Sequence, residues 1–172
     1  MKKFLIVVLV LLAFKSFSQV KFMGINIEGN KTEVISKLRQ KGFKLNSFGY
    51  LEGYTNNKKV LLNVEDYCGK VYRIYYSERS TRNQTEIIDR FNILLKQFEN
   101  DKRYIKVSGD LIENVESLSY EMNVKNKVYE AVFIQLPKEN KNRVRFCITR
   151  HYGGEFYIKT YYENLLNEPK DY

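Results

Sequence analysis

Residues 83–100 carry the strongest secondary-structure signal in the chain. Apolar residues recur there every three or four positions, the spacing of one helix face: Ile87, Ile88, Phe91, Leu94, Leu95 and Phe98. Asn83 and Glu86 stand three positions apart at the start, which is the spacing of a capping box. Short segments on both sides alternate between apolar and polar residues, which predicts strands. Helices combined with locally connected strands indicate an α+β protein with an antiparallel sheet.

A second helix is expected before the first group of strands, over residues 31–41. Asn30 and Glu33 again have the spacing of a capping box, and apolar residues follow on one face. The joins Asn56-Asn57 and Cys68-Gly69 have the residue types that form tight hairpin turns. The segments that these turns separate are predicted to be strands: 48–55, 58–65 and 71–77.

The second group of segments begins with an extended piece at 104–107. Asp110 and Glu113 could then cap a third helix, because apolar residues follow at helical spacing: Leu111, Val115, Leu118 and Met122. Residues 118–124 also alternate like a strand, but the helix is the favoured interpretation. Residues 128–136 are apolar on both faces, which favours a central strand covered on both sides. Two further strands are expected at 144–149 and 156–162.

The resulting order, α-βββ-α-α-βββ, contains two groups of elements that resemble each other. At an offset of 84 positions, Val60 aligns with Val144, Val64 with Ile148, and Val34 with Leu118. This predicts two similar helix-plus-three-strand units in an antiparallel sheet with helices packed on one side. The predicted divisions are a signal peptide at 1–18, a first unit at 19–80, a linking helix and extended segment at 81–109, and a second unit at 110–172.

The first eighteen residues have the order of a secretory signal peptide. Lysines at positions 2 and 3 precede an apolar run at 4–14, and Ser16 and Ser18 fit a small-x-small cleavage site. The run would rise only about 16 Å as a helix, against a hydrocarbon core of roughly 30 Å, so cleavage is favoured over an uncleaved anchor. We therefore expect an exported protein, periplasmic or secreted, with no transmembrane segment after cleavage.

The charge of the chain favours acidic partners. Residues 1–18 contain three lysines and no acid, so the net charge of +9 falls to +6 after cleavage. The basic residues are spread along the chain without a block of like charge, which does not favour nucleic acid as a partner. An acidic protein or an anionic envelope polymer is the expected partner, with binding that weakens as salt increases.

Two cysteines, Cys68 and Cys147, are the only ones in the chain. Outside the cytoplasm they could form a disulfide, although two unpaired thiols are the default interpretation. No cysteine and histidine spacing typical of a metal site occurs, so no metal or cofactor is expected.

The layout resembles that of known exported bacterial proteins. The matching residues are Phe22-Met-Gly-Ile-Asn-Ile-Glu-Gly29 before a capped helix that ends at Lys41-Gly42-Phe43, followed by two sets of hydrophobic hairpins. Many small exported α+β proteins share this pattern. The tandem arrangement also resembles the β-lactamase-inhibitor proteins, although the helix count and loop lengths differ and no inhibitory residue can be transferred. The resemblance implies a sheet that offers a concave face to another protein.

Catalytic motifs are not found in the sequence. His151 is the only histidine, and the nucleophile elbow, the phosphate-binding loop and the zinc-protease motif are missing. Four acids near strand ends leave open a small secreted hydrolase that acts on sugars or peptides through paired carboxylates: Glu52, Glu65, Asp66 and Glu78.

The last two strands predict a binding face. Their apolar residues point one way, and the alternate residues point the other way. The second set includes residue types enriched at protein interfaces, and it forms the candidate binding site: Arg143, Arg145, Tyr157, Lys159 and Tyr161. A plain solvated sheet face is the alternative. The favoured function is an exported, non-catalytic binding domain. The two alternatives are the small secreted hydrolase and a structural envelope protein with a permanent partner.

Overall fold

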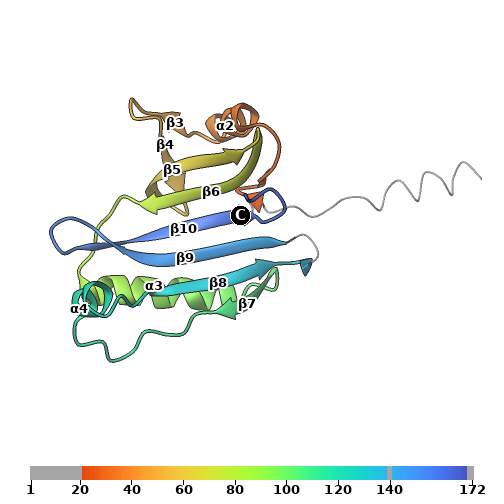
Figure 1. Cartoon of the computed structure of the whole chain (residues 1–172). Helices are drawn as coiled ribbons and strands as arrows, with labels where there is room; N and C mark the ends of the chain where they lie inside the picture. The colour runs from red at the N-terminus through yellow and green to blue at the C-terminus, as the bar shows by residue number, and fades with distance from the viewer. Residues whose placement is uncertain (1–20, 139–140, 170–172) are drawn as a thin grey trace, which may run out of the picture.

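The computed structural model describes residues 21–138 and 141–169. It contains one eight-stranded antiparallel sheet, a two-stranded sheet and three helices in the described ranges (Figure 1). The predicted α+β class with antiparallel sheet is confirmed at this level. The predicted signal peptide, residues 1–18, lies outside the described residues.

The elements alternate between helices and groups of strands. The first half contains β1 (Lys21–Phe22), β2 (Ile25–Asn26), α2 (Lys31–Gln40), β3 (Lys44–Leu45), β4 (Leu51–Thr55), β5 (Lys58–Tyr67) and β6 (Lys70–Glu78). The second half contains α3 (Gln84–Glu99), β7 (Tyr104–Ser108), α4 (Leu118–Asn123), β8 (Glu130–Gln135), β9 (Asn142–Arg150) and β10 (Phe156–Asn164). The order in the large sheet is β3-β4-β5-β6-β10-β9-β8-β7, so β6 and β10 pair at its middle.

The first two predicted helices are confirmed, and each begins at its predicted cap. The Asn30 side chain accepts the backbone N–H of Thr32 at the start of α2. At the start of α3, Asn83 accepts the backbone N–H of Glu86, and Glu86 accepts that of Asn83, which completes the capping box. These bonds satisfy N–H groups that have no partner within the helix.

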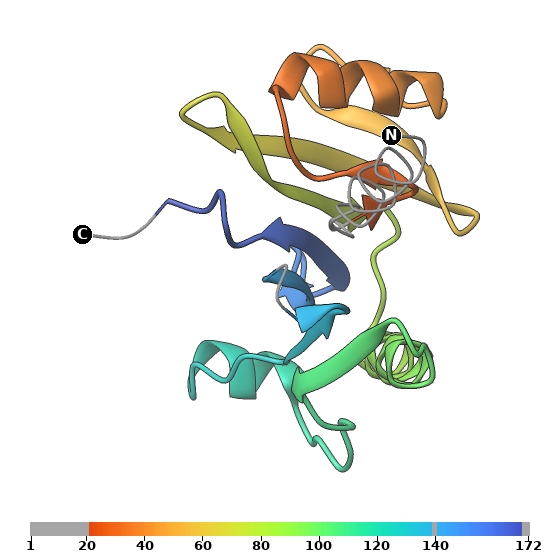
Figure 2. The same ribbon diagram turned by 90° about the vertical axis from the view of Figure 1, so that its right-hand side faces the viewer.

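The register of the strands shows which side chains share a face. Leu62 lies opposite Tyr76, Tyr76 opposite Thr160, and Thr160 opposite Phe146, so these four residues form one row. The buried cluster packed by α2 includes Leu62 and Tyr76, and the cluster packed by α3 includes Phe146. Both helices therefore cover the same face of the sheet (Figure 2).

The alternate residues of the central strands point to the opposite side, which we call the open face. In Figure 1 this side is turned toward the viewer, with α3 behind β8 and β9. The polar and aromatic residues of the open face include Asn63, Glu65, Arg73, Tyr75, Ser77, Glu130, Arg143, Arg145, Cys147, Thr149, Tyr157, Lys159, Tyr161 and Glu163, and Leu61, Val132 and Ile134 lie in the same rows.

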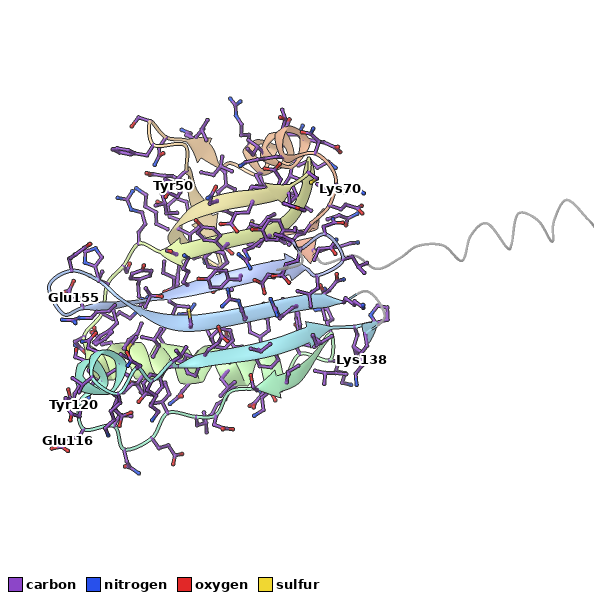
Figure 3. The ribbon with its side chains drawn as sticks, in the orientation of Figure 1. Tyr50, Lys70, Glu116, Tyr120, Lys138 and Glu155 are labelled. Carbon is purple, nitrogen blue, oxygen red and sulfur yellow. The ribbon has the colours of Figure 1, made fainter. Side chains whose placement is uncertain are left out.

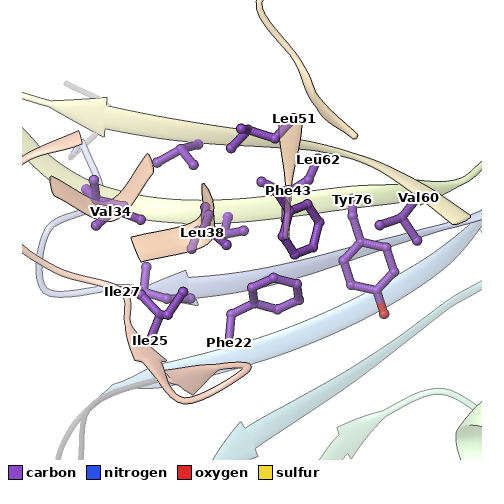
Figure 4. Packing of buried hydrophobic residues seen from close by; sticks show 13 residues of the cluster. Phe22, Ile25, Ile27, Val34, Leu38, Phe43, Leu51, Val60, Leu62 and Tyr76 are labelled. Carbon is purple, nitrogen blue, oxygen red and sulfur yellow. The ribbon is translucent and has the colours of Figure 1, made fainter. Parts of the chain in front are cut away.

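Aromatic rings pack among aliphatic side chains in the core under α2 (Figure 4). The ring centroid of Phe22 lies 6.4 Å from that of Phe43 and 5.8 Å from that of Tyr76. Phe43 rests on β4 at Gly53, where an added Cβ would lie 2.5 Å from the Phe43 ring. Glycine at this position is therefore a packing requirement, because a side chain would displace the ring.

The predicted third helix is wrong over most of its length. Residues 109–117 have no helix, and α4 begins only at Leu118, where the Ser117 side chain accepts the N–H of Tyr120. Asn92 of α3 accepts the N–H of Ile112 and donates to its carbonyl. The side chain of Asn92 thus bonds backbone groups of the segment that would bond to one another if the segment were a helix.

Two further expectations need correction at the α3 end of the sheet. The strand alternative for residues 118–124 is wrong, because α4 occupies most of that range. β8 is not central: it lies next to β7, the outermost strand on that side. The helix and the extended segment expected at 81–109 are α3 and β7; α3 contributes to the second buried cluster and β7 to the sheet.

Candidate functional site

The five residues of the candidate binding site lie together on the open face. Arg143 and Arg145 are on β9, and Tyr157, Lys159 and Tyr161 are on the neighbouring strand β10. Tyr161 lies directly opposite Arg145 in the register. Figure 3 shows the side chains of this face in the orientation of Figure 1.

A buried carboxylate, Glu163, is the centre of the charges on this face. Its side chain is 0% exposed and accepts bonds from three arginines. Arg73 Nε lies 2.8 Å from Oε1, Arg143 Nε lies 2.6 Å from Oε2, and Arg145 Nε lies 3.3 Å from Oε1. A carboxylate can be fully buried only with partners of this kind, because burying an unpaired charge destabilises the fold by roughly several kcal/mol.

Three further acids surround the arginines. Arg73 Nη1 lies 3.0 Å from Glu65, and Arg145 Nη1 lies 2.7 Å from Glu130. Glu168 Oε1 accepts from Arg73 Nη2 at 3.2 Å and from Arg143 Nη2 at 3.4 Å. We call these three arginines with Glu65, Glu130, Glu163 and Glu168 the arginine–glutamate cluster. The charges of Arg143 and Arg145 are therefore compensated within the fold.

The pKa of the Glu163 carboxyl is lowered from its ordinary value of 4.5. Burial alone would raise this pKa, but the hydrogen bond from Arg143 and the charges of Arg143, Arg145 and Arg73 outweigh it. Since the folded protein holds the charged form more strongly than the unfolded chain does, the ionised Glu163 stabilises the fold above its unfolded pKa.

Acid is therefore expected to weaken the protein through Glu163. Its contribution should be present above about pH 4.5 and should be lost as the pH falls through the lower, folded pKa. Urea unfolding at a series of pH values from about 6 to about 3 measures this loss. The Glu163→Gln variant should show a shallower decline over the same range, and an equally steep decline in that variant would assign the effect to other carboxyls.

Lys159 differs from the arginines because it makes no ion pair within residues 21–138 and 141–169. Its Nζ lies 4.3 Å from the ring centroid of Tyr75 and 5.2 Å from that of Tyr161. The two tyrosine rings are 5.7 Å apart. We call Tyr75, Tyr157, Lys159 and Tyr161 the lysine–tyrosine patch. Its cation is held by ring faces and keeps an uncompensated charge for an incoming anion.

The hydroxyl and thiol groups at the patch favour their protonated forms. Burial raises the pKa of the Tyr161 hydroxyl to about 12, so it stays protonated at neutral pH. Burial likewise raises the pKa of the neighbouring Cys147 thiol, which keeps it in its less reactive form. The Arg145 guanidinium lies over the same Tyr161 ring, 3.8 Å from its centroid.

The two cysteines are free thiols, so the disulfide that the sequence permitted is not formed. Cys147 on β9 lies opposite Lys159, Lys159 lies opposite Ser77, and Ser77 lies opposite Leu61 on β5, so Cys147 and Leu61 are in one row. Cys68 lies seven residues beyond Leu61 along the chain, a separation of roughly 20 Å along the strand. A disulfide needs Cα atoms within about 7 Å.

The four acids considered for a hydrolase each have cationic partners. Glu52 binds Lys59 and Arg79, Glu65 binds Arg73, and Asp66 binds Lys31. Glu78 is buried on the helix-covered side, where Arg90 of α3 lies 2.6 Å and Arg82 lies 2.7 Å away. These carboxylates form ion pairs that join neighbouring elements.

The binding face predicted from the sequence left out several residues that the structure places at the site. Alternation along β10 extends from Tyr161 to Glu163, and alternation along β6 places Arg73 and Tyr75 on one face, so this signal was present. Glu168 lies after the last strand and reaches the arginines through the path of the chain, which no spacing rule predicts.

Comparison with known proteins adds no relative: no family model, curated protein or solved structure matches the chain. Among residues 21–138 and 141–169, no group of three or more histidine, cysteine or acidic side chains could hold a metal ion. The helices of the same ranges are too short or too polar to cross a membrane.

Proposed function

We propose that this protein is an exported, non-catalytic binding domain whose open face docks a protein or an acidic envelope component. The observation that carries the proposal is Lys159, a cation without an ion pair in the described ranges that lies over the rings of Tyr75 and Tyr161, on the side of the sheet opposite to α2 and α3. An acidic group of the partner would pair with Lys159, and the tyrosines would supply apolar contact area.

The strands that carry the patch are joined to both of their neighbours. Lys159 and Tyr161 lie on β10, which pairs with β6 on one side and β9 on the other. The arginine–glutamate cluster ties these three strands together through Glu163, Arg73 and Arg143. A surface that is already ordered loses little entropy on binding, which favours affinity.

We also propose that the domain consists of two similar units. The order α2-β3-β4-β5-β6 is repeated as α3-β7-β8-β9-β10, with α4 inserted after β7. The strand order, with β6 and β10 paired in the middle, supports this division. The counterpart of α2 is then α3, not the segment at 110–122 that the offset of 84 implied. The likeness to the tandem β-lactamase-inhibitor fold remains part of this proposal.

Lysine footprinting tests the binding face whatever the identity of the partner. The protein is mixed with an extract of the envelope of its own cells, lysines are acetylated, and the labelling of each is quantified by mass spectrometry. Lys96 is the matched control, because it is an exposed lysine on α3, behind the other face of the sheet.

Labelling of Lys159 is expected to fall by at least about tenfold when the partner is bound at saturating concentration, because a buried amine cannot react. Labelling of Lys96 should stay the same. Protection of Lys96 with full labelling of Lys159 would place the interaction on the helices and contradict the proposal, as would labelling unchanged at every lysine.

A further inference from the structure

Glu168 is the one member of the arginine–glutamate cluster that does not lie on a strand. Glu65, Glu130 and Glu163 belong to β5, β8 and β10, whereas Glu168 lies in the segment 165–169 that follows β10. This segment crosses to β6, where the Asn167 side chain donates to the Val71 carbonyl at 3.0 Å. The path brings the Glu168 carboxylate to Arg73 and Arg143 at one end of the open face.

The bonds to Glu168 are the longer ones that these two arginines make. Their Nη2 groups lie 3.2 and 3.4 Å from Glu168 Oε1, whereas their Nε groups lie 2.8 and 2.6 Å from Glu163. The Glu168 side chain is 29% exposed, and that of Glu163 is 0% exposed. Glu163 is thus the fixed partner, and Glu168 is the carboxylate that can leave at the lowest cost.

We propose that Arg73 and Arg143 form an oxyanion site that Glu168 occupies from within the chain. Arg73 on β6 and Arg143 on β9 lie in one row of the sheet, on either side of Glu163. Their two guanidinium Nη2 groups converge on a single oxygen, which is the donor arrangement that favours carboxylate or phosphate. The ligand is a carboxylate of an acidic peptide or a phosphate group, which displaces Glu168 and takes over its two bonds.

The charges around the site permit this exchange. When Glu168 leaves, the three arginines face the three strand carboxylates, Glu65, Glu130 and Glu163. An incoming anion restores the charge that Glu168 supplied, so the strands need not rearrange. Hydrogen bonds anchor the backbone of residues 165–167, among them those from Leu165 N–H to the Lys141 carbonyl and from Leu166 N–H to Asn164 Oδ1. The exchange therefore requires only the Glu168 side chain to turn away from the arginines.

This site borders the lysine–tyrosine patch, since Arg73 lies 5.8 Å from the Tyr161 ring centroid, but the two share no residue. The site does not depend on the function proposed for the patch. Glu168 acts as a competitor in the same molecule, so the affinity for an external anion is reduced by the fraction of time that Glu168 is bound. Removing the Glu168 charge should therefore expose the site, whatever the partner of Lys159 is.

The test uses phosphate and a short acidic peptide, acetyl-Glu-Glu-Glu-amide, with acetyl-Gln-Gln-Gln-amide as the uncharged control peptide. Binding to the wild type, Glu168→Ala and Glu168→Gln is followed by the NMR shifts of the arginine Nε–H groups at constant ionic strength. Glu168→Gln keeps the size of the side chain, so it preserves the fold if alanine loosens the segment. Glu130→Gln is the matched control, because Glu130 binds Arg145 and not this site.

Both Glu168 variants are expected to bind one of the two anions at least about tenfold more tightly than the wild type and Glu130→Gln do. The gain should vanish when Arg143→Gln is added to Glu168→Ala. A gain with phosphate alone assigns the ligand as a phosphate, and a gain with the acidic peptide alone assigns it as a carboxylate. Equal binding by all variants, or a gain that survives Arg143→Gln, would overturn the site.

Discussion

Replacing Glu163 with glutamine is expected to lower the free energy of unfolding by about 3–5 kcal/mol. Glutamine has nearly the same shape, so the loss comes from charge and hydrogen bonding and not from a cavity. The neutral amide would leave Arg73, Arg143 and Arg145 without the buried carboxylate that they share. Urea unfolding, followed by circular dichroism, measures the difference.

Glu65→Gln is the matched control for this prediction. Glu65 also binds Arg73, but its side chain is 31% exposed, so water can replace the lost bond. Its cost should be about 1 kcal/mol or less, as for other partly exposed pairs. Equal costs for the two variants would mean that Glu163 is not the centre of the cluster.

Replacing Gly109 with alanine is expected to cost about 3 kcal/mol or more. Gly109 follows β7 at a φ of +103°, a conformation that side chains disfavour. An added Cβ would lie 2.6 Å from Ala131 Cα on β8 and 2.9 Å from the Glu130 carbonyl oxygen. Backbone atoms cannot rotate away, so β7 or β8 would have to shift.

Gly153→Ala separates the two causes of this loss, the strain at positive φ and the clash of the added Cβ with β8. Gly153 has a similar φ of +97°, but an added Cβ there would meet nothing within 4 Å. Only the backbone strain remains, so the cost should be roughly 1 kcal/mol by urea unfolding. If both variants lose the same stability, the close approach of β7 to β8 at Ala131 has no energetic consequence.

Local patterns were sufficient for much of the fold. The capping residues Asn30 and Asn83 start their helices at the predicted positions, because the cap bonds involve residues two or three apart. The alternation in β9 and β10 correctly put the five candidate residues on one face. Period-two patterning reports the face of a strand and does not depend on which strands lie beside it.

Long-range contacts account for what was missed. The segment at 110–117 has a helical pattern, but Gln84 and Asn92 of α3 bind its backbone, and no local pattern contains that information. Arg143 and Arg145 were correctly placed on the open face, but their compensation depends on Glu163, Glu130 and Glu168, which other elements bring close. Residue type alone cannot tell a paired arginine from an unpaired lysine.

The proposed binding therefore depends on Lys159, and the ion pairs of the arginine–glutamate cluster join the strands around it. A charge reversal, Lys159→Glu, tests this most directly, with Lys96→Glu on α3 as the matched control. Each immobilised protein is incubated with the native envelope extract, and retained partners are quantified after circular dichroism and urea unfolding show that all variants are folded.

We expect Lys159→Glu to reduce the retained partner by at least about tenfold, which corresponds to about 1.4 kcal/mol, and Lys96→Glu to leave retention unchanged. Added salt should weaken retention by the wild type, because the pairing is electrostatic. Undiminished retention by a folded Lys159→Glu variant would contradict the account and leave the open face as plain solvated surface.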